Sequence, residues 1–167
     1  VQGIQFFLGI VIARLINPSD YGLIAMLGIF LAIAQTFTDS GFSQALIQKK
    51  NRNETDFSTV FFFNFGISVV IFLLFCLGAS GIASFYNEPK LELITRWVAL
   101  NIILTALSIV QRTELTIKMD FKTQAKASLV SVVLSGILGV TLAWLGFGVW
   151  ALVWQTLCNS LLNTILL

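Results

Sequence analysis

Long apolar runs separated by short polar segments dominate the chain and predict helices that cross a membrane. A helix needs roughly 20 apolar residues to span a bilayer, because it rises about 1.5 Å per residue through a hydrocarbon core of about 30 Å. Six runs have this character, and the first is the shortest. We expect spans over about residues 1–16, 21–48, 57–85, 93–111, 125–145 and 149–167, forming a single membrane domain over 1–167.

Turn residues separate these runs at three places. They are Asn17-Pro18-Ser19-Asp20, Asn87-Glu88-Pro89 and Gly146-Phe147-Gly148, and Asn, Pro and Gly favour turns for distinct conformational reasons. The first of these segments also offers a capping residue to the helix that follows. The first apolar run is already under way at Ile4, with no charged segment before it. We therefore expect the first span to lack its beginning.

Basic residues are unevenly distributed between the two sets of connections. Seven of the ten follow the second and fourth runs: Lys49, Lys50, Arg52, Arg112, Lys118, Lys122 and Lys126. The other three lie near the remaining connections: Arg14, Lys90 and Arg96. Successive connections of a six-span bundle alternate between the two sides of the membrane. The positive-inside rule then predicts that the connections after the second and fourth spans are cytoplasmic.

The composition supports a membrane protein and excludes several other classes. The chain of 167 residues is 57% hydrophobic and 11% charged, whereas soluble domains carry roughly 25% charged residues. The absence of histidine excludes a His-based metal site or triad. Cys76 and Cys158 lie inside apolar runs, so we interpret them as packing residues. The net charge of +2 does not point to nucleic acid. The connections are too short for a catalytic domain, and no phosphate-binding or dinucleotide motif occurs, so we expect neither an enzyme nor a cofactor.

Polar and small residues fall on one face of each expected helix. Asn101, Thr105, Ser108 and Arg112 follow the spacing i, i+4, i+7, i+11, which keeps them on one side of an α-helix. The other runs carry comparable stripes: Gln2, Gln5, Gly9 and Ala13; Gly28, Ala32, Gln35 and Asp39; Asn64 and Ser68; Ser128, Ser131, Ser135 and Gly139; Gln155, Asn159 and Asn163. Such faces are costly against lipid and require protein or water as neighbours.

Two interpretations of the stripes remain open. Small and polar residues allow close helix packing and hydrogen bonds between helices, which suits the repeat of residues 128–139. The amides that recur on the second, fourth and sixth runs slightly favour a hydrated cavity for a polar substrate. The candidates for lining such a cavity are Gln35, Asp39, Asn64, Asn101, Thr105, Ser108, Arg112, Gln155 and Asn159.

Four charged residues near or within the runs allow both a structural and a functional role. Asp39 is the only acidic residue well inside an apolar run, so it is the candidate for coupling to an ion gradient. It is equally suited to capping a helix break at Ser40-Gly41 or to an interfacial position. Arg14 and Arg96 are candidates for contacting an anionic substrate, because a guanidinium matches phosphate oxygens. These two and Arg112 also suit snorkelling to the interface, and Arg112 suits pairing with Asp39.

Several segments resemble a known family when they are taken together in order. They are ARLINPSDYGLIAM, DSGFSQALIQKK, TDFSTVFFFN, FYNEP, VQRTELTIKMDFK and GFGVWALV. The chain resembles, over nearly its whole length, the polysaccharide flippases related to Wzx and to the teichuronic acid exporters. These belong to the multidrug/oligosaccharidyl-lipid/polysaccharide exporter superfamily.

The resemblance implies an all-α, polytopic transmembrane helix bundle of about six spans, the N-terminal bundle of a two-bundle transporter. Its implied substrate is an undecaprenyl-pyrophosphate-linked glycan, which the transporter would move across the bacterial cytoplasmic membrane by alternating access. The implied partners are the lipid bilayer, a C-terminal bundle of the same protein and the polysaccharide polymerase machinery.

Three alternatives remain open. A multidrug or cation antiporter of the same superfamily would protect cells from cationic dyes, whereas a glycan flippase would restore surface polysaccharide. An intramembrane glycosyltransferase or polymerase would need catalytic groups in sizeable exterior loops, and the longest such loop lies only near residues 87–92. A third alternative is a non-functional fragment of the flippase.

Overall fold

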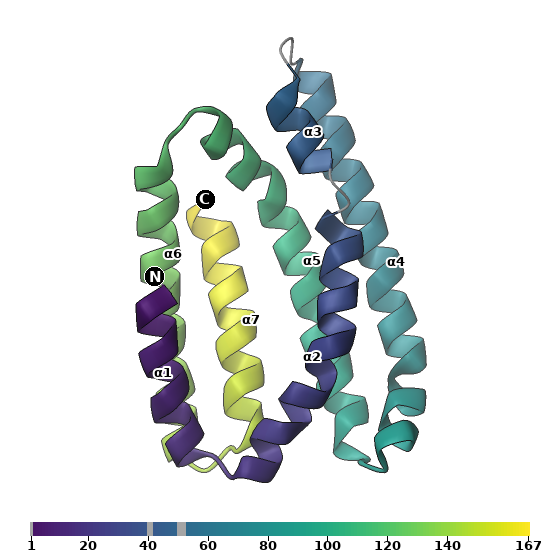
Figure 1. The fold of residues 1–167 in the computed structure, drawn as a ribbon, viewed down its shortest axis with the longest axis vertical. Helices are drawn as coiled ribbons and strands as arrows, with labels where there is room; N and C mark the ends of the chain where they lie inside the picture. The colour runs from purple at the N-terminus through teal and green to yellow at the C-terminus, as the bar shows by residue number, and fades with distance from the viewer. Residues whose placement is uncertain (1, 40–41, 50–52) are drawn as a thin grey trace.

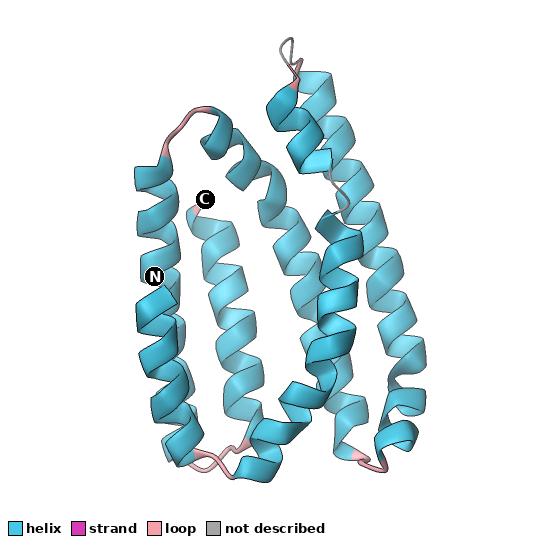
Figure 2. Ribbon diagram, viewed as in Figure 1, coloured by secondary structure: helices cyan, strands magenta, loops and turns pink. Residues whose placement is uncertain are grey.

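The computed structural model describes residues 2–39, 42–49 and 53–167, and within these ranges the secondary structure is helical throughout. The expected all-α class is therefore confirmed. The described helices are α1 (Gln2–Leu15), α2 (Pro18–Asp39), α3 (Phe42–Gln48), α4 (Glu54–Tyr86), α5 (Lys90–Ile117), α6 (Phe121–Trp144) and α7 (Val149–Leu166). Short loops connect them (Figure 2).

The helices run up and down along the long axis of the molecule (Figure 1). The connections at residues 16–17, 87–89 and 145–148 lie at its lower end, and the α3–α4 and α5–α6 connections lie at its upper end. Lys49, Lys118, Lys122 and Lys126 belong to the upper end, whereas Arg14, Lys90 and Arg96 belong to the lower end. The bundle therefore separates the basic residues as the alternation of spans predicts. Lys50 and Arg52 lie outside the described residues.

Five of these helices are long and apolar enough to cross a membrane. They are α2, α4, α5, α6 and α7. The first expected span, over about residues 1–16, corresponds to α1, an apolar helix of 14 residues that is shorter than the other five. A window of α4 reaches the highest mean hydropathy, 2.6, as expected for a helix with a large lipid-facing surface.

The second expected span requires a correction. The apolar run was expected to form one span over 21–48, with a helix break at Ser40-Gly41 considered only as one role for Asp39. In the structure, α2 ends at Asp39 and a separate seven-residue helix, α3, begins at Phe42. The hydropathy of the run does not reveal such a break, because the helices before and after the break both contribute hydrophobic residues to the run. The run contains Ser40 and Gly41, two residues with lower helix propensity than alanine, and these lie outside the described residues.

Helix ends follow local capping chemistry. Asp56 accepts a hydrogen bond from the backbone N–H of Asn53 at 3.0 Å in a capping box at the start of α4. Asn87 adopts a left-handed conformation with φ 55° and terminates α4. α5 extends to Ile117, six residues beyond the expected end, because the charged residues from Arg112 onward remain compatible with a helix that emerges from the membrane.

Three apolar cores hold the described helices together. One joins α2 and α5, with partly buried residues of α4 packed against it, and α7 contributes to the other two. The larger core joins α2, α4, α5 and α7 around Leu27, Leu91, Ile94 and Val153. The smaller core joins α1, α6 and α7 around Ile12, Ala143 and Ala151. Because α7 lies between these two cores, it presents a different face to each half of the bundle.

The lower ends of α2 and α7 approach each other closely at Gly148. This glycine has φ +56°, and a Cβ atom added there would lie 2.6 Å from Oδ2 of Asp20. Only glycine satisfies both requirements without strain. The contact places the Asp20 carboxylate beside the N-terminus of α7, where the helix dipole favours negative charge.

Candidate functional site

The small residues of α6 form the surface on which α1 and α7 pack. A Cβ atom added to Gly136 would overlap the side chain of Leu8 in α1. A Cβ atom on Gly139 would lie 2.9 Å from Cδ of Gln155 in α7. Ser131 is buried, and its hydroxyl donates to the carbonyl of Ala127 at 2.8 Å. The two glycine contacts bring α1 and α7 close to the backbone of α6, as the packing interpretation of the small-residue repeat expects.

A cavity of about 190 Å³ opens beside this contact, between α1, α6 and α7. Its lining residues are Gln5, Val132, Ser135, Gln155, Thr156 and Asn159. Five of the six carry a polar side chain, although all three helices are predominantly apolar. The structure thus brings together two of the predicted cavity residues, Gln155 and Asn159, with Gln5 and Ser135 from the stripes on other helices.

The polar residues that line this cavity differ in how their hydrogen-bonding groups are used. The hydroxyls of Ser135 and Thr156 donate within their own helices, to Val132 at 3.3 Å and to Leu152 at 2.9 Å. The Oδ1 atom of Asn159 is buried and accepts no hydrogen bond from the described residues. Leaving such an atom unpaired costs roughly 1–3 kcal/mol.

The polar stripe of α5 lies on its side toward α7. Trp97 and Trp154 contact with ring centroids 5.5 Å apart, and the Thr164 hydroxyl of α7 donates to the Leu104 carbonyl at 3.0 Å. Asn101 lies on α5 between these two contacts, and its buried Oδ1 has no partner in the described structure. The stripe therefore begins within a helix interface.

The hydroxyls of the α5 stripe are satisfied within the helix itself. Thr105 donates to the carbonyl of Asn101 at 2.8 Å, and Ser108 donates to that of Thr105 at 2.9 Å. Ser108 is buried, whereas Arg112 is exposed at the upper end of the stripe. Arg112 forms no ion pair with the described side chains. Its expected pairing with Asp39 is untested, because the side chain of Asp39 lies outside the description.

The remaining cavity candidates lie on α2 and α4, away from the cavity lining. Asn64 is completely buried, and neither its Oδ1 nor its Nδ2 atom has a described hydrogen-bond partner. Ser68, one turn further along α4, is also buried and donates to the Phe65 carbonyl at 2.7 Å. Gln35 is half-buried on α2, and Asp39 is the last residue of that helix.

The two arginines proposed to contact an anion lie at the lower end of the bundle. Arg96 pairs with Glu92 at 2.6 Å, one turn away on the exposed surface of α5. Arg14 is exposed in the last turn of α1, with no ion pair in the part of the chain that is described. Arg96 thus has a structural partner one turn away, at the i, i+4 spacing that brings opposite charges together on a helix.

Sequence reasoning did not select Gln5, Ser135 or Thr156 as site residues. Gln5 and Ser135 belonged to recognised polar stripes, and their meeting depends on which helices are neighbours. Thr156 gave no signal of its own, since a lone threonine in an apolar run satisfies its hydroxyl within the helix. No cluster of three or more potential metal ligands from His, Cys, Asp and Glu occurs among the described residues.

Comparisons with known proteins identify the family. The model of a family described as "Polysaccharide biosynthesis protein" matches residues 11–167. The succinoglycan biosynthesis transport protein ExoT of Rhizobium meliloti is 26% identical over 161 residues, which cover 96% of this chain and 33% of that protein. No solved structure shows a significant match.

Two further relatives are similar over part of the chain. The teichuronic acid biosynthesis protein TuaB of Bacillus subtilis is 30% identical over 102 residues, or 61% of this chain and 21% of TuaB. The lipopolysaccharide biosynthesis protein WzxC of Escherichia coli is 27% identical over 90 residues, or 54% of this chain and 18% of WzxC.

The chain matches a third or less of the length of each of these relatives. Five helices able to span a membrane, together with bacterial relatives in polysaccharide synthesis and transport, identify a multi-pass protein of the inner membrane. The resemblance found in the sequence motifs is confirmed. With a match that extends from residue 11 to residue 167, the chain belongs to the polysaccharide biosynthesis protein family of bacterial membrane proteins.

Proposed function

We propose that the chain forms the N-terminal helical bundle of a transporter that moves a lipid-linked oligosaccharide or polysaccharide precursor across the bacterial cytoplasmic membrane. The observation that carries this proposal is the polar cavity between α1, α6 and α7, within helices that are otherwise suited to lipid. Family membership supplies the class of substrate. The substrate we propose is a glycan on an undecaprenyl pyrophosphate carrier.

The chemistry of the cavity suits neutral sugar groups. Gln5, Gln155 and Asn159 provide amides, which both donate and accept hydrogen bonds, as sugar hydroxyls do. No charged side chain lines this cavity among the described residues, so a neutral glycan can enter and leave without breaking an ion pair. Moderate binding of this kind favours transport, because a substrate held too tightly is released slowly.

Alternating access requires a second body against which this bundle moves. We propose that a C-terminal bundle of the same protein supplies it, with the substrate pathway between the two. The candidates outside the cavity are then proposed to face this pathway in at least one transport state: Gln35, Asp39, Asn64, Asn101, Thr105, Ser108 and Arg112. The unpaired oxygens of Asn64 and Asn101 support this assignment. Asp39 is the proposed coupling residue.

Arg14 and Arg96 are proposed to contact the pyrophosphate of the carrier. Both are exposed near the lower end of the bundle, where a substrate phosphate would lie at the interface after translocation. The Arg96–Glu92 pair is exposed, and such pairs contribute only about 0–1 kcal/mol. A phosphate can therefore displace Glu92 at little cost.

Cysteine accessibility tests the hydrated cavity directly in the full-length protein. Single cysteines replace Gln155, Asn159 or Leu161 in a background without Cys76 and Cys158, and a membrane-impermeant thiol reagent is applied from each side. We expect labelling at positions 155 and 159 and little at 161, whose side chain is exposed on the lipid-facing surface of α7. If none of the three cysteines is labelled, the cavity is not hydrated.

A functional readout separates transport of glycans from transport of drugs. We expect the full-length protein to restore surface polysaccharide in cells that lack their own exporter. Protection from cationic dyes without restored polysaccharide would instead identify an antiporter of the same superfamily.

A further inference from the structure

A second cavity, larger and of opposite character, lies on the surface between α2 and α4. It measures about 710 Å³, and its lining consists almost entirely of carbon. Phe37 of α2 forms one wall, and Phe63, Ile67, Val70 and Leu74 of α4 form the other, with Gly66 between them. Phe37, Val70 and Leu74 have more than half of their surface exposed. We call this cavity the α4 groove.

A polar pocket lies about one helical turn from the groove along α4, toward the N-terminus of that helix. It measures about 180 Å³ and lies between α3 and α4, with Lys49, Asp56 and Thr59 among its lining residues. The α4 residues of the pocket and of the groove follow intervals of three or four positions, which places them on one face of the helix. These residues are Asp56, Thr59, Phe63, Ile67, Val70 and Leu74.

The length of the groove matches one leaflet of a bilayer. From residue 62 to residue 74 the helix rises about 18 Å, and half of a hydrocarbon core of about 30 Å is about 15 Å. The polar pocket then lies at the level of the lipid headgroups. By the distribution of basic residues, this is the cytoplasmic leaflet.

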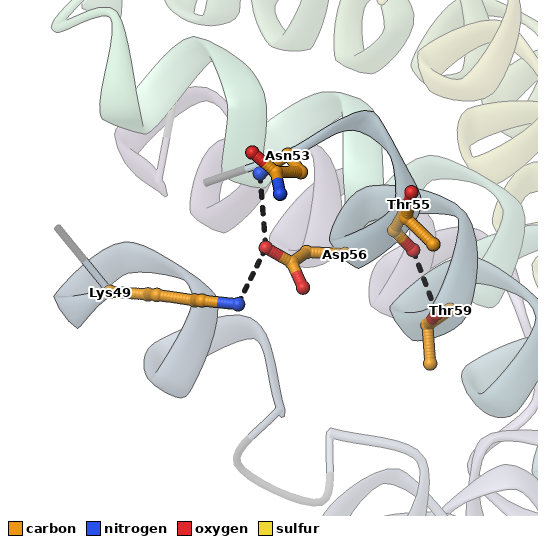
Figure 3. Close-up of polar contacts among 5 residues, drawn as sticks. All are labelled: Lys49, Asn53, Thr55, Asp56 and Thr59. Atoms are coloured by element: carbon orange, nitrogen blue, oxygen red, sulfur yellow. Dashed lines mark hydrogen bonds and ion pairs between the residues drawn. The ribbon is translucent and has the colours of Figure 1, made fainter. Parts of the chain in front are cut away.

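Among the described residues that line the pocket, Lys49 carries a positive charge and Asp56 a negative one (Figure 3). Nζ of Lys49 lies 2.7 Å from Oδ2 of Asp56, and Asp56 also accepts the backbone N–H of Asn53. The side chain of Lys49 is 51% exposed and that of Asp56 is 27% exposed. Lysine keeps two further N–H donors, and the second carboxylate oxygen of Asp56 can accept. A headgroup that carries both a phosphate and an ammonium complements this pair, whereas a purely anionic headgroup is repelled by Asp56.

We propose that the α4 groove and its polar pocket bind a zwitterionic phospholipid of the cytoplasmic leaflet, with one hydrocarbon chain in the groove. Its phosphate contacts Lys49, and its ammonium contacts Asp56. A primary ammonium fits better than a quaternary one, because it donates hydrogen bonds to the carboxylate. This inference concerns a lipid of the surrounding bilayer and does not depend on the proposed transport function.

The test uses phosphatidylethanolamine with a photoactivatable group in its acyl chain, in vesicles that contain the full-length protein. We expect preferential labelling of residues 62–74, relative to Leu77, which is 80% exposed on the same helix outside the groove. Matched phosphatidylglycerol and phosphatidylcholine probes should label the groove about two- to fivefold less, the range that exposed charge pairs provide.

A pair of glycine variants tests the groove itself. Space is open around both Gly66 and Gly78, with no atom within 4 Å of an added Cβ. Gly66→Leu fills the groove and should reduce labelling several-fold, whereas Gly78→Leu, outside the lining, should leave it unchanged. Asp56→Asn keeps an acceptor for the Asn53 amide and should remove the preference for phosphatidylethanolamine.

Three outcomes would overturn the proposal. The first is equal labelling by all three headgroups in the unmodified protein. The second is no difference between Gly66→Leu and Gly78→Leu. The third is labelling at Leu77 with none in residues 62–74, which would mean that another protein segment covers the groove.

Discussion

At the residue scale, unpaired amide oxygens distinguish this bundle from one built only for packing. Asn64, Asn101, Asn159 and Asn163 each bury an Oδ1 atom that has no described partner. Helix interfaces in membranes normally satisfy such groups, since lipid offers no hydrogen bonds. Of the four, only Asn159 lines the polar cavity, so it is the residue at which a packing role and a substrate role are most clearly separable.

Replacement of Asn159 by leucine separates the two roles. Leucine has a similar volume and removes a polar group that lacks a partner, so the fold should be as stable as before or slightly more stable. If Asn159 contacts the substrate, Asn159→Leu should reduce polysaccharide export about tenfold, the effect of losing about 1.4 kcal/mol of binding. Export of surface polysaccharide and thermal unfolding in detergent are both measured, with Asn159→Gln as the variant that keeps an amide. Unchanged export in the leucine variant would assign Asn159 to packing.

At the scale of the helix, side-chain capping explains where α6 begins. Asp120 precedes α6, and its side chain accepts from the backbone N–H of Thr123 at 3.1 Å and from the Thr123 hydroxyl at 2.7 Å. The Thr123 side chain and then its backbone N–H lower the pKa of Asp120 below its ordinary value of 3.8. These bonds favour the ionised carboxylate at the cap.

The lowered pKa of Asp120 predicts a pH dependence for the start of α6. Because the pKa is lower in the folded protein, the cap contributes its stability above pH 3.8 and loses it as the pH falls through the folded value. Hydrogen exchange of the Thr123 amide should therefore accelerate below pH 3.8 beyond the intrinsic trend. Asp120→Asn retains an acceptor without titrating, so its Thr123 amide should show no such acceleration. A matching acceleration in both proteins would contradict this origin.

At the scale of the whole molecule, the alternation of spans gives each end of the bundle a definite side. Met119 lies in the α5–α6 connection and is 79% exposed, and Phe147 lies in the α6–α7 connection and is 53% exposed. From the excess of basic residues at the end that contains Met119, we predict that this end lies in the cytoplasm.

Site-directed labelling measures this orientation. In a background without Cys76 and Cys158, we expect Met119→Cys to react with an impermeant thiol reagent only after the membrane is opened, and Phe147→Cys to react in intact cells. The reverse pattern would place the basic end outside. It would also move the polar pocket beside the α4 groove to the outer leaflet.

The sequence by itself determined the helical class and most of the spans, and it predicts the side on which each connection lies. These features depend on local length, periodicity and charge, which a single helix carries independently of its neighbours. The motifs also indicated the family, since they lie at helix ends and turns whose order is legible in the chain.

Only the tertiary structure decided which polar stripes share a cavity. Each stripe specifies a face of one helix, but the neighbour of that face depends on contacts between residues far apart in the sequence. Gln155 and Asn159 meet Gln5 and Ser135 because the glycines of α6 admit both α1 and α7, whereas Asn101 lies outside this lining, on α5. Hydropathy likewise did not show the division of one apolar run into α2 and α3. Burial of apolar residues stabilises one continuous helix and two separate helices alike.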